Sequence, residues 1–162
     1  MTISVGSKLP GGTALTMGAE GPEAVDLEAK FTGRNVVLFG LPGAYTGTCT
    51  NAHIPSFIRT KGQFDAKGVD EVICLSVNDP FVMAAWSKDT GAGAAGITML
   101  GDAGAEWVKA AGLDFTAEAV GLINRSKRFA LYAEDGEVKV LHVEDSPGSC
   151  GISAGEGLLE EM

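Results

Sequence analysis

The sequence contains few basic residues and no block of them. Lysine and arginine make up 12 of the 162 residues, against 21 aspartates and glutamates, so the formal net charge is −9. Proteins that bind nucleic acids usually present a basic face to the phosphate backbone. We therefore expect no nucleic acid partner.

The sequence also has no long apolar run. No stretch approaches the roughly 20 apolar residues that a helix needs to cross a bilayer. The first residues, Met-Thr-Ile-Ser-Val-Gly-Ser-Lys, have neither the charged segment nor the apolar core of a secretory signal. We therefore expect a cytoplasmic protein without a membrane partner.

No repeat, low-complexity tract or linker divides the chain. Hydrophobic residues make up 45% and charged residues 20%, as is typical of globular proteins. A chain of 162 residues can bury a core of its own. We expect a single domain over residues 1–162.

Cysteine is scarce and occurs at positions 49, 74 and 150. An odd number of cysteines does not make a disulfide framework, and in a cytosolic chain it indicates redox use, catalysis or burial. No Cys-x-x-Cys pair is present, and Cys49 and His53 alone, four residues apart, are too few for a zinc site. We expect no bound metal.

Cys49 follows an apolar run at 36–39 and the turn Pro42-Gly43, where a buried strand is expected to lead into a helix. A thiol in the first turn of a helix faces unpaired N–H groups and the positive end of the helix dipole, and both favour the reactive thiolate. A free cysteine is more often a small buried hydrophobe. The polar neighbours at 46, 48, 50 and 51 favour the reactive role here.

Two segments resemble one known family. Residues 41–57 resemble the peroxidatic signature of the peroxiredoxins, in the Prx5 (type II) branch, which reads Pro-x-x-x-Thr-x-x-Cys and then His-x-Pro. The matching positions are Pro42, Thr46, Cys49, His53 and Pro55. Residues 127–136 resemble the segment that supplies the active-site arginine, which falls on Arg128. The chain departs from the family pattern at Tyr45, Gly47 and Ser56, where phenylalanine, proline and glycine are usual.

The resemblance implies a thioredoxin-like fold and a thiol-dependent peroxidase for hydrogen peroxide and organic hydroperoxides. Cys49 would become a sulfenic acid, while Thr46, Arg128 and backbone N–H groups stabilise the stretched O–O bond and Pro42 shields the thiolate. No cofactor is implied. The reductant would be glutathione with glutaredoxin, or thioredoxin, and family members commonly form homodimers. The implied role is redox homeostasis and antioxidant defence.

Each of these residues also has a plainer interpretation. Thr46 could simply cap the helix, and we expect it both to cap the helix and to stabilise the O–O bond. Arg128 has two basic neighbours, Arg125 and Lys127, so a solvated basic face is the alternative. His53 could pair with Cys49 as a base, but we favour hydrogen bonding that steadies the helix around Pro55, where a kink is expected.

The reduction of the sulfenic acid is open on the sequence. Cys150 lies in a glycine-containing loop and loosely resembles the resolving position of two-cysteine family members, so it is the preferred resolving residue. Cys74 lies in an apolar strand, where burial is the default, and is the less favoured resolver. Direct reduction by an external thiol is the alternative to both.

Two other functions compete with the peroxidase. A dithiol–disulfide oxidoreductase is disfavoured because Ala52 stands where the second cysteine of a Cys-x-x-Cys motif would lie. A non-catalytic redox sensor or binding protein would use the oxidation of Cys49 as a signal. A sensor would consume peroxide once and stop.

The order of elements predicts an α/β sandwich with a mixed central sheet flanked by helices, compatible with the thioredoxin-like fold. Asp135-Gly136 is a strong hairpin signal, Pro80 opens a helix, and Ser153 is expected to cap a short C-terminal helix. Strands are expected near 13–17, 24–27, 35–40, 70–78, 97–100, 129–134 and 138–143, and helices from Cys49 to about 66, at 80–90 and at 103–111.

Overall fold

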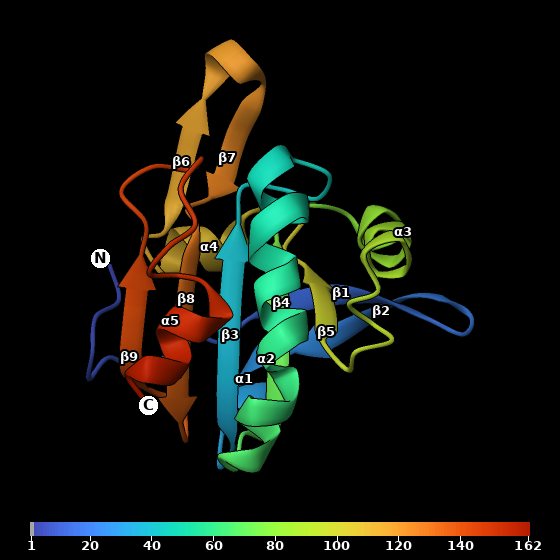
Figure 1. Ribbon diagram of the computed structural model, residues 1–162. Coiled ribbons are helices and arrows are strands. Elements are labelled where there is room, and N and C mark those ends of the chain that lie inside the picture. The colour runs from blue at the N-terminus through green and yellow to red at the C-terminus, as the bar shows by residue number, and fades with distance from the viewer. Residues whose placement is uncertain (1) are drawn as a thin grey trace.

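A computed structural model describes residues 2–162, and a mixed seven-stranded sheet forms its centre (Figure 1). The strand order is β2-β1-β5-β4-β3-β8-β9. The three strands β3, β4 and β5 run parallel, and the remaining pairs are antiparallel. The strands are β1 Thr13–Gly18, β2 Gly21–Asp26, β3 Asn35–Leu41, β4 Glu71–Ser76, β5 Thr98–Gly101, β8 Phe129–Glu134 and β9 Glu137–Val143.

Helices cover both faces of the sheet and enclose two apolar cores. One core packs α2 (Ile54–Ala66), α3 (Pro80–Thr90) and α5 (Gly155–Glu160) on one face. The other packs the short helices α1 (Leu27–Phe31) and α4 (Glu106–Ala110) on the opposite face. The expected mixed α/β sandwich is therefore confirmed. None of the helices in the described part of the chain is long and apolar enough to cross a membrane.

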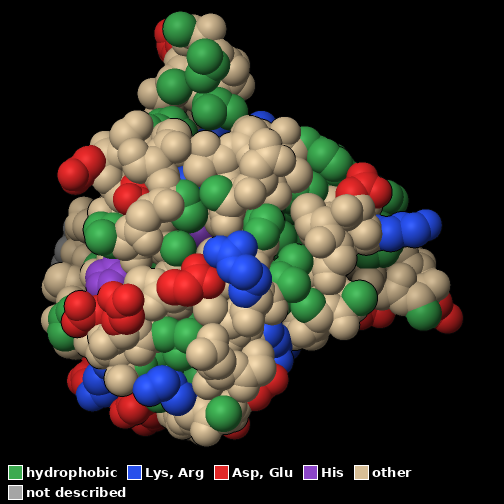
Figure 2. All heavy atoms as spheres, in the orientation of Figure 1, with side chains coloured by type: hydrophobic (Ala, Val, Ile, Leu, Met, Phe, Trp, Pro, Cys, Tyr) green, Lys and Arg blue, Asp and Glu red, His purple; other side chains and the backbone are tan. Residues whose placement is uncertain are grey.

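A second, two-stranded sheet projects beyond the end of the central sheet (Figure 1). It consists of β6 (Asp114–Ala117) and β7 (Leu122–Ser126), joined by the 3-10 turn η2 (Glu118–Val120). Apolar side chains gather on this hairpin (Figure 2), and Val120 and Ile123 are among its exposed residues. The sequence analysis did not predict it, because its strands carry no continuous apolar run.

Two local expectations differ from the structure, and one short helix was not expected. The helix expected at 103–111 is shorter, because Asp102 accepts hydrogen bonds from the N–H groups of Trp107 and Val108 and fixes the first turn there. Ser153 does not cap α5, because its hydroxyl bonds the carboxylate of Glu144. Helix α1, which is only five residues long, was not expected from the sequence.

The antiparallel pairing of β3 with β8 joins the two segments that the sequence analysis singled out. In this register Gly40 lies opposite Phe129, so the start of β8 meets the end of β3. A Cβ at Gly40 would lie 2.2 Å from the ring of Phe129, so only glycine fits there. Arg128, one residue before Phe129, is thereby placed beside the loop that leads to Cys49.

Candidate active site

Cys49 lies at the third residue of a helix that begins at Gly47, and its side chain is fully buried. Residues Cys49–His53 form a π-helical turn, η1, in which the Ile54 N–H bonds the carbonyl of Cys49. Pro55 has no N–H and cannot bond the Asn51 carbonyl, which an α-helix would require. The helix therefore widens by one π-turn just before Pro55, and such turns often occur at functional sites. The kink expected at Pro55 stays a prediction.

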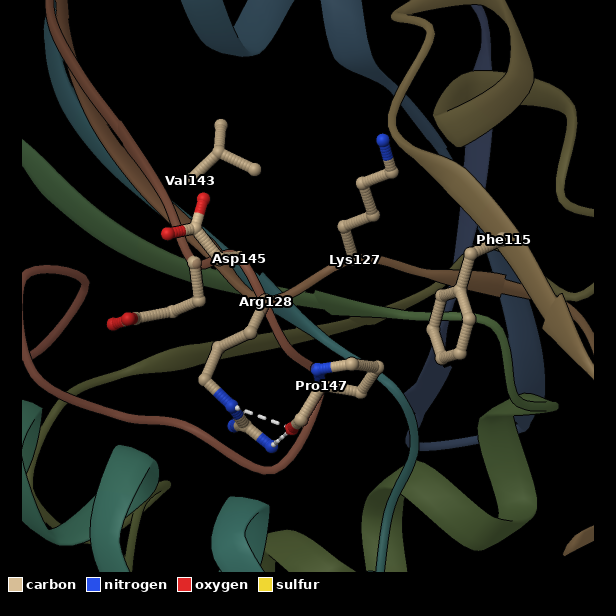
Figure 3. Close-up of a pocket in the computed structure, with 7 residues that line it drawn as sticks. Phe115, Lys127, Arg128, Val143, Asp145 and Pro147 are labelled. Carbon is tan, nitrogen blue, oxygen red and sulfur yellow. Dashed lines mark hydrogen bonds between the residues drawn. The ribbon is translucent and has the colours of Figure 1, made fainter.

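Arg128 contacts the sulfur of Cys49 directly. Its Nη2 lies 3.2 Å from Cys49 Sγ, and its Nη1 lies 3.0 Å from Nδ1 of His53. Nε and Nη2 also donate to the Pro147 carbonyl at 3.2 and 2.8 Å, as Figure 3 shows. Arg128 is only 1% exposed, so the alternative of a solvated basic face is wrong for this residue.

The hydroxyl of Thr46 donates to the carbonyl of Gly43 at 2.8 Å. The expected side-chain cap is wrong, since this is the only side-chain hydrogen bond of Thr46 within residues 2–162. Its backbone carbonyl instead accepts the N–H of Thr50 at 3.0 Å. A hydroxyl has one proton and two lone pairs, so the Thr46 oxygen keeps its capacity to accept a hydrogen bond.

His53 is fully buried, and both of its ring nitrogens are occupied. Arg128 can only donate, so Nδ1 accepts, and Nε2 carries the proton that it donates to the Ser153 carbonyl at 3.0 Å. Burial, followed by the charge of Arg128, lowers the pKa of His53 to about 3. The neutral ring has no free lone pair, so it can serve neither as a base for Cys49 nor as a metal ligand. No cluster of three or more potential metal ligands occurs among the residues described.

The loop before Cys49 is held from two sides. Pro42 is buried, and its carbonyl accepts a hydrogen bond from Nη1 of Arg125 at 3.1 Å. On the other side, the Ala44 N–H donates to Oδ1 of Asn78 at 3.0 Å. Sequence reasoning missed both contacts. Arg125 was visible in the sequence only as a basic neighbour of Arg128.

The segment after β9 passes over the site. Thr48 donates to the Gly148 carbonyl at 3.1 Å, next to the Pro147 carbonyl that Arg128 binds. Glu144 anchors the following residues by accepting from the N–H groups of Gly151 and Ser153, each at 2.8 Å. Burial opposes ionisation of Glu144, but the hydrogen bond from the Ser153 hydroxyl, the two N–H hydrogen bonds and the charge of Arg128 lower its pKa.

All three cysteines are free thiols. Cys150 is half-buried rather than exposed, and burial raises the pKa of its thiol. Cys74 is fully buried in β4, on the sheet face that also packs Cys49, and burial raises its pKa well above the usual value. Which thiol, if either, resolves Cys49 stays a prediction.

A cavity of about 360 Å³ opens beside Arg128, although Cys49 does not line it. Figure 3 shows Lys127 and Asp145 on opposite sides of it. The lining residues are Phe115, Lys127, Arg128, Val143, Glu144, Asp145 and Pro147.

Comparison with known proteins identifies the family. Residues 4–158 match the model of the Redoxin family. The chain is 43% identical over 99% of its length to "Peroxiredoxin-2E-2, chloroplastic" of Oryza sativa subsp. japonica, and covers 73% of that protein. This chain belongs to the peroxiredoxins.

Further peroxiredoxins match over nearly their whole length. "Peroxiredoxin-2C" of Oryza sativa subsp. japonica is 40% identical, with 99% of this chain and 98% of that protein covered. The crystal structure of reduced Prx3 from Vibrio vulnificus in complex with H₂O₂ superposes with a TM-score of 0.90 at 39% identity, covering 98% of both chains. The predicted thioredoxin-like peroxiredoxin fold is thus confirmed. Peroxiredoxins are thiol-dependent peroxidases, and this protein is an enzyme of that class.

Proposed function

We propose that this peroxiredoxin reduces hydrogen peroxide and organic hydroperoxides at Cys49. The Cys49 thiolate attacks one oxygen of the O–O bond, that bond breaks, and the other oxygen leaves as hydroxide or alkoxide and takes up a proton. Cys49 becomes a sulfenic acid. Two reductant thiols then return it to the thiol, forming a disulfide and water.

One observation carries the assignment of roles: the buried Arg128 guanidinium lies 3.2 Å from Cys49 Sγ. An ordinary thiol of pKa about 8.5 is about 3% ionised at pH 7, so complete ionisation gains only about thirtyfold. A fast peroxidase must also stabilise charge on the breaking O–O bond with fixed donors. Arg128 is placed for this, and the free lone pairs of Thr46 can accept the peroxide O–H. Pro42 excludes water from this side of the loop.

The reductant and the assembly belong to the same proposal. We assign glutathione with glutaredoxin, or thioredoxin, as the reductant, and the Prx5 (type II) branch as the subfamily. Exposed apolar side chains, among them Tyr45 and Phe81, support a homodimer. The three free thiols suit a reducing compartment, and we place the protein in the cytoplasm, in redox homeostasis and antioxidant defence.

The test is peroxide turnover with excess thiol reductant, comparing the wild type with Cys49→Ser. We expect many peroxide molecules consumed per wild-type chain and none above background in the variant, because serine does not ionise near neutral pH. A wild type that consumes one equivalent and stops would instead be a redox sensor. Turnover that persists in Cys49→Ser would refute the assignment of Cys49.

A further inference from the structure

We propose that Arg125 is a positioning residue for the peroxide reaction. Its guanidinium holds the Pro42 carbonyl and thereby sets the turn that presents Thr46 to the peroxide. This inference rests on the proposed function of Cys49 and Thr46. It assigns to Arg125 a role distinct from that of Arg128, which contacts the reacting sulfur.

The guanidinium of Arg125 fits the loop closely. Nη1 lies 3.1 Å from the Pro42 carbonyl oxygen. A Cβ built on Gly43 would lie 2.3 Å from the same Nη1, so the guanidinium occupies the space that any side chain at position 43 would need. The φ angle of Gly43 is not in the left-handed region, so this glycine is required by the contact and not by the backbone.

The turn that Arg125 holds also orients Thr46. The hydroxyl of Thr46 donates its proton to the Gly43 carbonyl at 2.8 Å, and this carbonyl belongs to the peptide group that follows the one held by Arg125. Rotation of the Gly43 carbonyl would therefore redirect the lone pairs of the Thr46 hydroxyl. Tyr45, between Gly43 and Thr46, has a φ of +64°. This conformation costs a non-glycine residue of order 1 kcal/mol and persists only when the surrounding structure holds it.

Arg125 belongs to the projecting hairpin and not to the central sheet. It lies in β7 opposite Phe115 of β6 (Figure 1), and is partly buried. No carboxylate among residues 2–162 lies within ion-pair distance of it. The guanidinium is therefore directed to a loop carbonyl, and the hairpin becomes the support of the loop that precedes Cys49.

The experiment compares Arg125→Ala with Lys127→Ala, which removes the same charge from an exposed neighbour. Two rates are measured: the second-order rate of Cys49 oxidation by H₂O₂, and the rate of Cys49 alkylation by iodoacetamide, which does not need Thr46. We expect Arg125→Ala to lower the peroxide rate about tenfold and to change alkylation by less than about twofold. Arg125→Lys should restore part of the peroxide rate, since lysine can donate one hydrogen bond. Lys127→Ala should match the wild type in both rates.

A double-mutant cycle with Gly43→Ala tests the contact itself. In the wild type the new Cβ displaces the guanidinium, so the peroxide rate should again fall about tenfold. In an Arg125→Ala background that space is empty, and Gly43→Ala should cost less than about twofold more. Additive losses would overturn the proposal, as would equal rates for Arg125→Ala and Lys127→Ala or equal losses of oxidation and alkylation. The wild type is the reference in every comparison. If its Cys49 is not oxidised by H₂O₂, the proposed function fails, whereas the proposal for Arg125 fails only through the differences between variants.

Discussion

Nη1 of Arg128 lies 3.0 Å from Nδ1 of His53, and both side chains are buried within the protein. A protonated imidazole could not accept this hydrogen bond, so the pair requires a neutral ring. The Ser153 carbonyl at Nε2 selects the tautomer. One histidine thus fixes the guanidinium over Cys49 and ties it to the C-terminal segment.

This relationship predicts an acid-sensitive stability. The pKa of His53 is lowered to about 3 in the folded protein, whereas a histidine in the unfolded chain titrates near 6.5. Between pH 6.5 and 3 the unfolded state binds one more proton than the folded state, so the free energy of unfolding rises with pH. The stability that His53 contributes is therefore complete above about pH 6.5 and is lost as the pH falls. From pH 6.5 to 5 the free energy of unfolding should fall by about 2 kcal/mol. Urea unfolding across this range measures it.

His53→Asn should remove this slope, whatever its effect on stability at neutral pH. His142→Asn is the matched control, because His142 is the other histidine and bonds a backbone carbonyl, that of Ile152. The same slope in wild type and His53→Asn would contradict the assigned ring state.

Arg128→Ala should lower the second-order rate of peroxide reduction by about a hundredfold, because the loss of one fixed hydrogen-bond donor to a developing charge commonly lowers the rate of a reaction by about this factor. Arg128→Lys keeps the charge but cannot reach Cys49, His53 and Pro147 at once, so it should recover little of the rate. Stopped-flow oxidation of Cys49 measures both. Lys127→Ala is the control here as well, and an equal effect of the two alanine variants would contradict the role of Arg128.

Thr46→Val, nearly equal in shape, removes the hydroxyl that bonds Gly43. The lost hydrogen bond should destabilise the fold by about 1 kcal/mol. The peroxide rate should fall by more than the folded fraction explains, because the acceptor lone pairs are lost too. Unfolding curves and peroxide kinetics on the same samples separate these effects. A lower melting temperature with an unchanged rate would show that Thr46 is only structural.

The fate of the sulfenic acid can be decided by peptide mapping after one equivalent of peroxide. We predict a Cys49–Cys150 disulfide in the wild type and in Cys74→Ser, and none in Cys150→Ser. For this bond the two Cα atoms must come within about 7 Å. We expect this to require opening of the Pro147 and Gly148 contacts over the site. Such a disulfide suits thioredoxin as the reductant.

The contrary result would be a sulfenic acid on Cys49 with Cys150 unmodified and turnover sustained by glutathione. The protein would then be a one-cysteine peroxidase. A Cys49–Cys74 disulfide would contradict the prediction in another way, and would require the buried thiol of β4 to ionise despite its raised pKa.

Local sequence determined the elements around the reactive cysteine. The apolar run at 36–39, the turn at Pro42-Gly43 and the polar residues near Cys49 indicate a buried strand, a loop and a helix start, since these signals act between near neighbours. The Asp135-Gly136 hairpin was predicted for the same reason, and the structure contains it between β8 and β9. The family resemblance, and not periodicity, selected Arg128 from three neighbouring cations.

Only the tertiary structure decided which distant groups meet. Arg128 is 79 residues from Cys49, and Ser153 is 100 residues from His53. Their contacts depend on the pairing of β3 with β8 and on the path of the chain after β9, which no local pattern specifies. Arg125 is a further example, since its partner is a backbone carbonyl 83 residues away. Every residue has a backbone carbonyl, so the sequence does not show which carbonyls accept side-chain hydrogen bonds. These contacts become visible only in the folded structure.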